Sequence, residues 1–353
     1  MYYINENVKD LFRIFDQNSR DGYIRMDLNE NPVGLPQEFI DEVLSKVTPE
    51  FVAKYPEQLE FTRKLAKFIG VEVENICLVN GSAEGIRYII QAYSRPGGKV
   101  LSVSPSYAMY DVYCNMYGRQ SVHVNYDDNL EMDVENIVDS IDDDIDLVII
   151  LNPNNPVGDV YTYEEMDKIV AACKEHECTL LIDEAYFYFY PNSFIRYAME
   201  NEHVLLTRTF SKVFSLAGAR LGYVVGQKEY VEIVQKLATP HNINAFGMLF
   251  AQAIIEKEGM LDELVEKQLQ GKQHLIDTLQ EKGYQVSAKE GNFIFIKPKH
   301  LDSETIVRRM KEEKKILIKV YNNVPNLGNC LRVSTGETEV MDTFIKALED
   351  IDR

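Results

Sequence analysis

The sequence predicts an α/β fold, with a large domain on a mostly parallel seven-stranded sheet and a smaller α+β domain at the C-terminal end. Short apolar runs rich in β-branched residues alternate with amphipathic stretches, which is typical of βαβ units. A run such as Leu147–Leu151 is apolar at every position, so helices should cover both faces of the sheet. With 353 residues the chain is long enough for about two domains.

Seven segments in the first two thirds of the chain are predicted to be strands of the large sheet. They are Ile76–Val79, Val100–Val103, Val122–Val124, Leu147–Leu151, Leu180–Asp183, Val204–Thr207 and Gly222–Val225. The clearest helices between them are Ser82–Tyr93, Thr162–Glu175 and Lys228–Ala238, which have a helical apolar period. Residues 41–255 are assigned to this large domain.

The pattern changes near residue 260. A long helix is predicted over Met260–Lys282, followed by strands at Asn292–Lys297, Ile316–Val320 and Cys330–Ser334 and by a closing helix. Residues 256–353 are therefore assigned to the small domain. Residues 1–40 have no sheet pattern of their own and are expected to pack with it.

Composition and charge exclude several classes of protein. Hydrophobic residues make up 45% and charged residues 26%, as in globular proteins, and no run of 18 apolar residues predicts a membrane span. The formal net charge of −19 argues against a nucleic-acid partner, because phosphate backbones are bound by clustered Lys and Arg. A small phosphorylated ligand stays compatible, since a few converging donors bind it whatever the net charge.

Cysteine usage and the N-terminal residues favour a reducing, cytoplasmic location. The five cysteines have no regular spacing, and the first residues lack the basic-then-apolar order of a secretory signal. Cys173, His176 and Cys178 are residue types that bind metals. They lie where an amphipathic helix runs into a strand and no second ligand pair follows, so we expect no metal site.

Lys212 is the first candidate for catalysis. Its stretch, Thr209–Arg220, combines the lysine with nearby hydroxyl groups and with an arginine eight positions later. An amine that attacks a carbonyl must be desolvated and positioned, which suits a lysine that holds pyridoxal phosphate as a Schiff base. Thr209, Ser211 and Arg220 would then bind the phosphate. An ordinary serine-capped helix fits the same stretch, so residues elsewhere in the sequence are needed to distinguish the two interpretations.

Two strand ends supply partners for the cofactor ring. Asp183 ends an apolar strand, where a buried carboxylate needs a cation such as a protonated pyridine nitrogen. Tyr186 and Asn155, each in a loop after a strand, could hydrogen-bond the phenolic oxygen of the ring. The alternatives are a capping role for Asp183 and a plain turn around Asn155.

Two further strand ends complete the predicted cofactor site. Ser82 and Ala83 open a helix directly after a strand, and free amides at a helix start form a phosphate seat. Tyr107 follows another strand and offers an aromatic face on which the ring could stack. Each feature is weak alone, and Tyr107 could equally be an ordinary core or surface tyrosine.

Together these motifs resemble those of the class I and II, fold type I, aminotransferases that use pyridoxal phosphate, and look most similar to the histidinol-phosphate aminotransferase branch. The resemblance covers nearly the whole chain, up to Gly336. Its motifs are Leu28–Pro32, Tyr55–Glu57, Gly81–Gly85, Asp183–Tyr186 and Ser211–Arg220.

The resemblance implies a mechanism and a set of catalytic residues. Lys212 would form the Schiff base and move a proton between the substrate Cα and the cofactor, with Asp183 and Tyr186 as further catalytic residues. The reaction would be a ping-pong transfer from an amino acid or amino-alcohol phosphate to 2-oxoglutarate. Histidinol phosphate is the leading donor, which implies a transaminase of histidine biosynthesis.

The resemblance also implies substrate contacts and a partner subunit. Arg332 matches the arginine that clamps a substrate carboxylate, and Asn31 and Asn155 would also contact the substrate. Tyr55 would reach the cofactor phosphate of a neighbouring subunit, so the enzyme would be a homodimer with shared active sites.

Two departures leave the substrate open. Lys319 stands where the branch has a second arginine that binds substrate phosphate, thirteen residues before the last one. The segment before Leu28 also lacks the usual stretch that contains tyrosine and glycine. Either the enzyme accepts histidinol phosphate with altered contacts, or it uses another amino donor. Two rival functions also stay open: a decarboxylase of a phosphorylated amino acid, similar to threonine-phosphate decarboxylases, and a non-enzymatic regulatory domain that only binds the cofactor.

Overall fold

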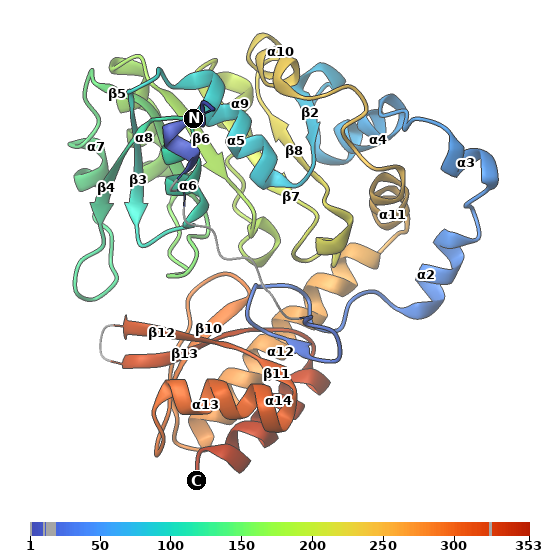
Figure 1. Ribbon diagram of the computed structural model, residues 1–353, viewed down its shortest axis with the longest axis vertical. Helices are drawn as coiled ribbons and strands as arrows, with labels where there is room; N and C mark the ends of the chain where they lie inside the picture. Colours follow the sequence, from blue (N-terminus) through green and yellow to red (C-terminus); the bar gives the residue numbers. More distant parts are fainter. Residues whose placement is uncertain (1, 10, 12–18, 325–326) are drawn as a thin grey trace.

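The large sheet has the predicted architecture. The computed structural model describes residues 2–9, 11, 19–324 and 327–353. Seven strands form this sheet in the order β2-β8-β7-β6-β5-β3-β4 (Figure 1). They are β2 (Ile76–Val79), β3 (Lys99–Ser104), β4 (Gln120–Asn125), β5 (Ile145–Leu151), β6 (Thr179–Asp183), β7 (Val204–Thr209) and β8 (Gly222–Val225). Only β8 runs against its neighbours, so the mostly parallel seven-stranded sheet is confirmed.

Helices cover the sheet on both sides, as the apolar strands require. Every residue of β7 and β8 is buried, which matches the expectation for strands between two helical layers. The surrounding helices are α4 (Leu59–Ile69), α5 (Ser82–Tyr93), α6 (Met109–Met116), α7 (Val134–Val138), α8 (Tyr163–Glu175), α9 (Ile195–Glu200), α10 (Lys228–Leu237) and α11 (Ala245–Glu256). A capping box of Thr162 and Glu165 sets the start of α8.

The C-terminal part has a sheet of its own. Its four strands follow the order β12-β13-β10-β9, and all neighbours are antiparallel. The elements are α12 (Met260–Glu281), β9 (Gln285–Ser287), β10 (Phe293–Lys297), α13 (Ser303–Arg309), β11 (Ile316–Leu317), β12 (Lys319–Val324), β13 (Gly328–Ser334) and α14 (Thr338–Ile351). The predicted small α+β unit is therefore present.

The strand predicted over residues 316–320 is divided in the structure. Ile316 and Leu317 form β11, which pairs in parallel with β1 (Ile24–Arg25) in a separate two-stranded sheet. Ile316 and Ile318 are buried in the small core, and β12 begins only at Lys319. The single predicted strand was wrong because a distant segment, absent from the local pattern, pairs with its first half. The short strand β9 was not predicted.

Only part of the N-terminal segment joins the small core. Met26 is fully buried there, and its carbonyl accepts a hydrogen bond from Ser334 N at 2.9 Å. The prediction that residues 1–40 pack with the small domain is wrong for Glu6–Lys9, which lies against the helix Met109–Met116 beside the large sheet. The other N-terminal elements are α1 (Glu6–Lys9), α2 (Gln37–Leu44) and α3 (Pro49–Ala53). The domain boundaries at residues 40 and 255 stay a prediction.

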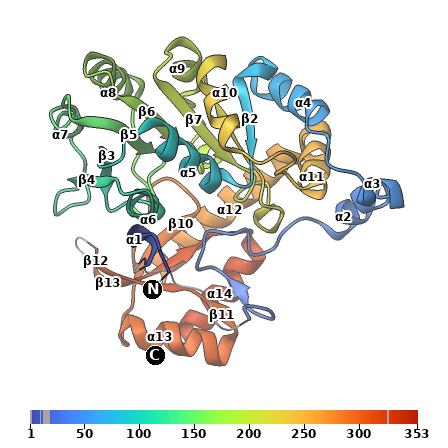
Figure 2. The same cartoon turned by 45° about the horizontal axis from the view of Figure 1, so that its top comes forward.

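The strand directions decide where a site can form. The carboxyl ends of β5, β6 and β7 point toward the small sheet, which lies across from them in both views (Figures 1 and 2). In open α/β sheets this edge is where ligands bind. Among the described residues, no helix combines the length and apolarity needed to cross a membrane.

Candidate active site

A cavity of about 820 Å³ lies at the carboxyl edge of the large sheet, and the small part of the chain forms its other wall. Most of the predicted residues border it: Ser82, Ala83, Tyr107, Asn155, Asp183, Tyr186, Thr209, Ser211, Lys212, Arg220, Lys319 and Arg332. Four residues of the N-terminal segment also border it: Arg25, Leu28, Asn29 and Glu30. Segments far apart in the sequence therefore meet in one cavity of the size that small ligands occupy.

One end of the cavity gathers donors suited to a phosphate. The side-chain oxygens of Thr209 and Ser211 are 2.9 Å apart, and Arg220 Nη1 lies 3.4 Å from the Ser211 hydroxyl. The start of α5 faces the same place, and its first N–H groups have no partner within the helix. A Cβ added to Gly81 would lie 2.5 Å from Arg220 Nη2, so this glycine lets the guanidinium approach the helix start.

The other end holds a buried carboxylate. Asp183 accepts hydrogen bonds from Tyr110 Oη at 2.9 Å, Thr207 Oγ1 at 3.2 Å and Ala185 N at 3.1 Å. Burial raises the pKa of Asp183 to about 6 even though these donors act to lower it. No cation contacts this carboxylate among the described residues, so it is a site that a bound cation would complete.

The buried charge of Asp183 gives a prediction about stability. The folded protein holds this proton more tightly than the unfolded chain, so stability is highest below the ordinary pKa of 3.8 and falls as pH rises through about 6. Asp183→Asn should therefore stabilise the cofactor-free protein by about 2 kcal/mol at pH 7 and by much less at pH 4.5. Urea unfolding at the two pH values measures the difference.

The same variant should bind the cofactor less well. Asparagine keeps the shape of Asp183 but cannot pair with a protonated ring nitrogen, so we expect at least about tenfold weaker binding of pyridoxal phosphate. An Asp183→Asn protein that is less stable than the parent at pH 7, or that binds the cofactor equally well, would contradict this account.

Lys212 lies between the two ends, in the loop after β7. Its Nζ donates a hydrogen bond to the Leu28 carbonyl at 3.1 Å and lies 5.5 Å from the centroid of the Tyr186 ring. Burial, assisted by the positive charge of Arg332, lowers the pKa of Lys212 to about 8. About a tenth of the amine is then neutral at pH 7, which is the form that attacks a carbonyl.

Asn155 and Tyr186 border the middle of the cavity. Asn155 Oδ1 accepts a hydrogen bond from Arg332 Nη1 at 3.2 Å. The Tyr186 hydroxyl accepts one from Asn29 Nδ2 at 2.9 Å, and burial raises its pKa to about 12. At neutral pH this hydroxyl keeps its proton and can donate it in a hydrogen bond to a ligand oxygen.

The small sheet contributes two cations. Lys319 on β12 is paired directly with Arg332 on β13, so both side chains lie on the same face of the sheet and border the cavity. Tyr321, two residues after Lys319, borders it as well. Arg332 donates to the Asp27 carbonyl at 2.8 Å, whereas its Nε is buried without a partner in the described part of the chain. An anion would satisfy such a donor.

Two predicted residues lie outside the cavity lining. Asn31 donates to the Ser215 hydroxyl at 2.7 Å, so it contacts the loop that carries Lys212. Tyr55 is 78% exposed and stacks on His241 with ring centroids 4.8 Å apart. Substrate contact by Asn31 and a contact of Tyr55 with a second subunit stay predictions. No cluster of three or more His, Cys, Asp or Glu side chains in the described ranges is placed to hold a metal.

Several residues of the site were not predicted, among them Tyr110, Thr207 and Asn29. Thr207 ends the predicted strand that follows the one ending in Asp183. This position at a strand end could have identified Thr207 as a residue of the site. Asn29 belongs to the motif Leu28–Pro32 that carried the family resemblance. Tyr110 had no signal beyond its place three residues after Tyr107.

The residues of the cavity fit pyridoxal phosphate. Its phosphate needs the donor set around Arg220, its ring nitrogen needs the buried carboxylate of Asp183, and its aldehyde needs an amine of lowered pKa such as Lys212. The half-buried Tyr107 borders the cavity with an aromatic ring that packs edge-on against Tyr110. Each part of the cofactor therefore has a matching group.

Comparisons with known proteins agree with a site for pyridoxal phosphate. The family model of class I and II aminotransferases matches residues 22–348. The histidinol-phosphate aminotransferase of Thermoanaerobacter pseudethanolicus is 32% identical over 352 residues, which cover 99% of this chain and 98% of that protein.

Two solved structures share the fold. The histidinol-phosphate aminotransferase of Sinorhizobium meliloti in complex with pyridoxal-5'-phosphate has a TM-score of 0.81 at 24% identity and covers 93% of this chain and 90% of its own. The L-threonine-O-3-phosphate decarboxylase of Porphyromonas gingivalis has a TM-score of 0.77 at 22% identity, with 93% and 98% covered. One architecture is thus found in proteins named for transamination and for decarboxylation.

Proposed function

Because the chain belongs to the class I and II aminotransferases, which depend on pyridoxal phosphate, we propose that it moves an amino group from histidinol phosphate to 2-oxoglutarate. The observation that carries this choice of substrates is the pair of cations, Lys319 and Arg332, opposite each other at one end of the cavity. A phosphate dianion and the carboxylates of an oxo acid are both anions that such a pair would bind. The relative from Thermoanaerobacter pseudethanolicus is named for histidinol phosphate, which supports the same donor.

The side chains have separate tasks in this proposal. When bound, the cofactor supplies an electron sink that weakens the bonds at the substrate Cα. Lys212 Nζ would accept the proton from the substrate Cα as a base and donate it again as an acid. Asp183 would hold the ring nitrogen in its protonated form. The hydroxyl of Tyr186 and the amide of Asn155 would hold the phenolic oxygen beside Lys212.

A donor screen tests the substrate. The holoenzyme is mixed with one amine at a time, without an oxo acid, and the visible absorbance of the bound cofactor is followed. Histidinol phosphate should convert the cofactor to its amine form much faster than histidinol, because only the phosphate ester engages Lys319 and Arg332. Equal rates for the two amines would show that the phosphate is not recognised, and the proposed donor would be wrong.

The fold shared with a threonine-phosphate decarboxylase makes decarboxylation the second candidate. The same screen separates the two, since release of carbon dioxide from threonine phosphate without consumption of an oxo acid would favour the decarboxylase. A domain that only binds the cofactor would show neither reaction. The complete set of Lys212, Asp183 and Arg220 around one cavity supports an enzyme.

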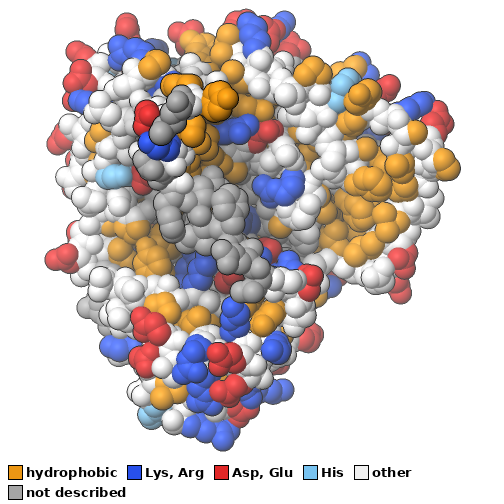
Figure 3. All heavy atoms as spheres, viewed as in Figure 1, with side chains coloured by type: hydrophobic (Ala, Val, Ile, Leu, Met, Phe, Trp, Pro, Cys, Tyr) orange, Lys and Arg blue, Asp and Glu red, His pale blue; other side chains and the backbone are white. Residues whose placement is uncertain are grey.

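We propose a homodimer that uses an exposed apolar surface, here called the α2–α11 surface. Large apolar side chains gather over α2, α3 and α11 at the right of the face in Figure 3. The exposed members are Leu44, Val52, Tyr55, Leu59 and Phe246, and Phe51 packs edge-on against Phe246 at 5.3 Å. Apolar side chains concentrated in this way are typical of protein interfaces. The family resemblance implies that Tyr55 of one subunit reaches the cofactor phosphate of the other, and Tyr55 is an exposed member of this surface.

The dimer gives a prediction with two variants. Tyr55→Phe should remain a dimer and bind pyridoxal phosphate about three- to tenfold more weakly, because only one hydroxyl donor is lost. Val52→Glu should be monomeric and lose most cofactor affinity, since a charge would be buried in the interface. Analytical ultracentrifugation and absorbance titration measure the two effects. A monomeric parent enzyme with full turnover would contradict the shared site.

The proposed location is the cytoplasm, and the state of the cysteines supports it. All five are free thiols and are buried in the structure. Since disulfides are rare in reducing compartments, five unpaired thiols agree with such a compartment.

A further inference from the structure

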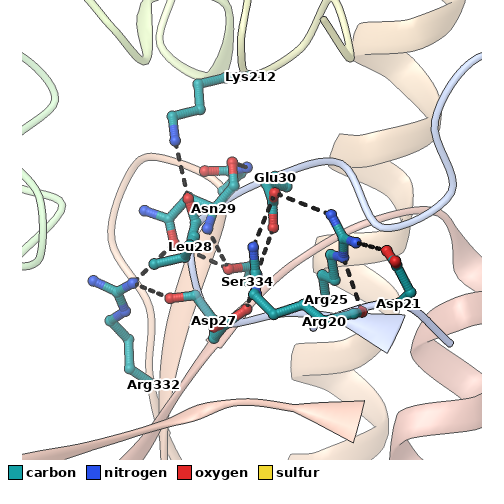
Figure 4. Close-up of polar contacts among 11 residues, drawn as sticks. Arg20, Asp21, Arg25, Asp27, Leu28, Asn29, Glu30, Lys212, Arg332 and Ser334 are labelled. Carbon is teal, nitrogen blue, oxygen red and sulfur yellow. Dashed lines mark hydrogen bonds and ion pairs between the residues drawn. The ribbon is translucent and has the colours of Figure 1, made fainter. Parts of the chain in front are cut away.

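Residues 27–30 pass over the cavity and contact three of the residues assigned to the chemistry. The Leu28 carbonyl accepts from Lys212 Nζ at 3.1 Å, and the Asp27 carbonyl accepts from Arg332 at 2.8 Å (Figure 4). Asn29 donates to Tyr186 at 2.9 Å. A shift of these four residues would therefore move the partners of Lys212, Tyr186 and Arg332 together.

One side chain holds both ends of this segment. Arg20 Nη2 lies 2.5 Å from Asp27 Oδ1 and 2.7 Å from Glu30 Oε2, and Nη1 lies 3.3 Å from Glu30 Oε1. The three side chains are 17%, 15% and 22% exposed, so the ion pairs are largely shielded from water. Arg20 does not border the cavity. Arg25 Nη1 lies 3.9 Å from Glu30 Oε1, a longer ion pair than that of Arg20.

We propose that Arg20 is a positioning residue that clamps residues 27–30 and thereby sets both the place of the Leu28 carbonyl and the charge balance around Lys212. The forked guanidinium binds two carboxylates at once, which a single point charge cannot do with the same geometry. The inference rests on the proposed role of Lys212. It adds a residue outside the cavity, from a part of the sequence in which no motif was found.

The charge balance gives the clamp a measurable signature. Burial lowers the pKa of Lys212, Arg332 and Arg220 lower it further, and Glu30 and Asp183 raise it. The Tyr186 ring is the other group that faces the amine. Loss of Arg20 removes a cation and leaves Glu30 without its short ion pair, and both changes favour a protonated nitrogen at Lys212. Loss of the Glu30 charge has the opposite effect.

The experiment compares four holoenzymes with the parent: Arg20→Gln, Glu30→Gln, the double variant and Arg20→Lys. The absorbance of the lysine-bound cofactor is titrated against pH, and kcat and KM are measured. We expect the apparent pKa of the lysine–cofactor linkage to rise in Arg20→Gln, to fall in Glu30→Gln and to return near the parent value in the double variant. Turnover of Arg20→Gln should fall roughly tenfold, and Arg20→Lys should recover part of it.

A control and a contradicting result are available. Arg308 forms an exposed ion pair with Glu312 on the small domain, so Arg308→Gln should leave the titration unchanged. If Arg20→Gln leaves the apparent pKa unchanged, or if the double variant departs further from the parent than either single variant, the clamp has no such role. Failure of the proposed function is distinguishable, because histidinol phosphate would then not convert the bound cofactor in the parent enzyme, whereas the pH titration of the lysine-bound cofactor does not depend on the donor.

Discussion

Lys212→Ala is expected to lower kcat/KM on the order of 10⁴-fold, because no other side chain that borders the cavity supplies an amine in the same position. Burial lowers the pKa of Lys212 to about 8, and its loop also carries donors for phosphate, whereas Lys319 lies on the wall formed by the small sheet. The variant should still bind pyridoxal phosphate through Asp183 and Arg220. Steady-state kinetics with the donor identified by the screen measures the loss.

The chain contains its own control for this prediction. Lys272 on α12 is also buried, and burial lowers its pKa to about 8, but its Nζ donates to the carbonyls of Lys289 and Gly291 and does not border the cavity. Borohydride reduction of the holoenzyme should therefore attach the cofactor to Lys212 alone. A label on Lys272, or a Lys212→Ala protein that keeps both label and turnover, would contradict the assignment.

Arg332→Met is expected to lower kcat/KM about 10²- to 10³-fold for both the amino donor and the oxo acid. The guanidinium is buried, its Nε has no partner in the described ranges, and methionine preserves much of the side-chain volume without a donor. The Asn155 and Asp27 contacts would be lost as well, so part of the effect should appear in kcat.

Lys319→Met gives the matched comparison, since Lys319 is the cross-strand neighbour of Arg332. A single point charge should cost only about tenfold, and mainly in KM for a donor that carries a phosphate. Equal losses of kcat/KM for histidinol phosphate and histidinol would show that Lys319 does not bind the phosphate. Arg308→Gln, far from the cavity, should change neither constant.

The sequence predicted the cofactor half of the site because its signals are local. Asp183 is the last residue of β6, Asn155 and Lys212 lie in the loops after β5 and β7, and parallel strands bring their carboxyl ends to one edge. Correct assignment of the strands therefore also predicts that these side chains lie close together. The helix start at Ser82 follows the same logic.

The contacts of the N-terminal segment with the site could not be predicted, because no local pattern contains them. This segment, which carries the Leu28 carbonyl, pairs with β11 through a strand of two residues, which is too short for a detectable period. The prediction of one strand over residues 316–320 was wrong for the same reason. Ion pairs between positions seven and ten residues apart, as in Arg20 with Asp27 and Glu30, leave no periodic signal either.

The pairing of Asn29 with Ser334 has a consequence for synthesis of the protein. These residues are 305 positions apart, and Asn29 N donates to the Ser334 hydroxyl at 2.8 Å. As the chain leaves the ribosome, the donors for phosphate, between residues 82 and 220, are all available long before β13 exists. The N-terminal segment must wait for that strand, and contacts over such a distance form slowly. The strands and loops that carry the phosphate donors can therefore fold together before the N-terminal segment finds its partner strand.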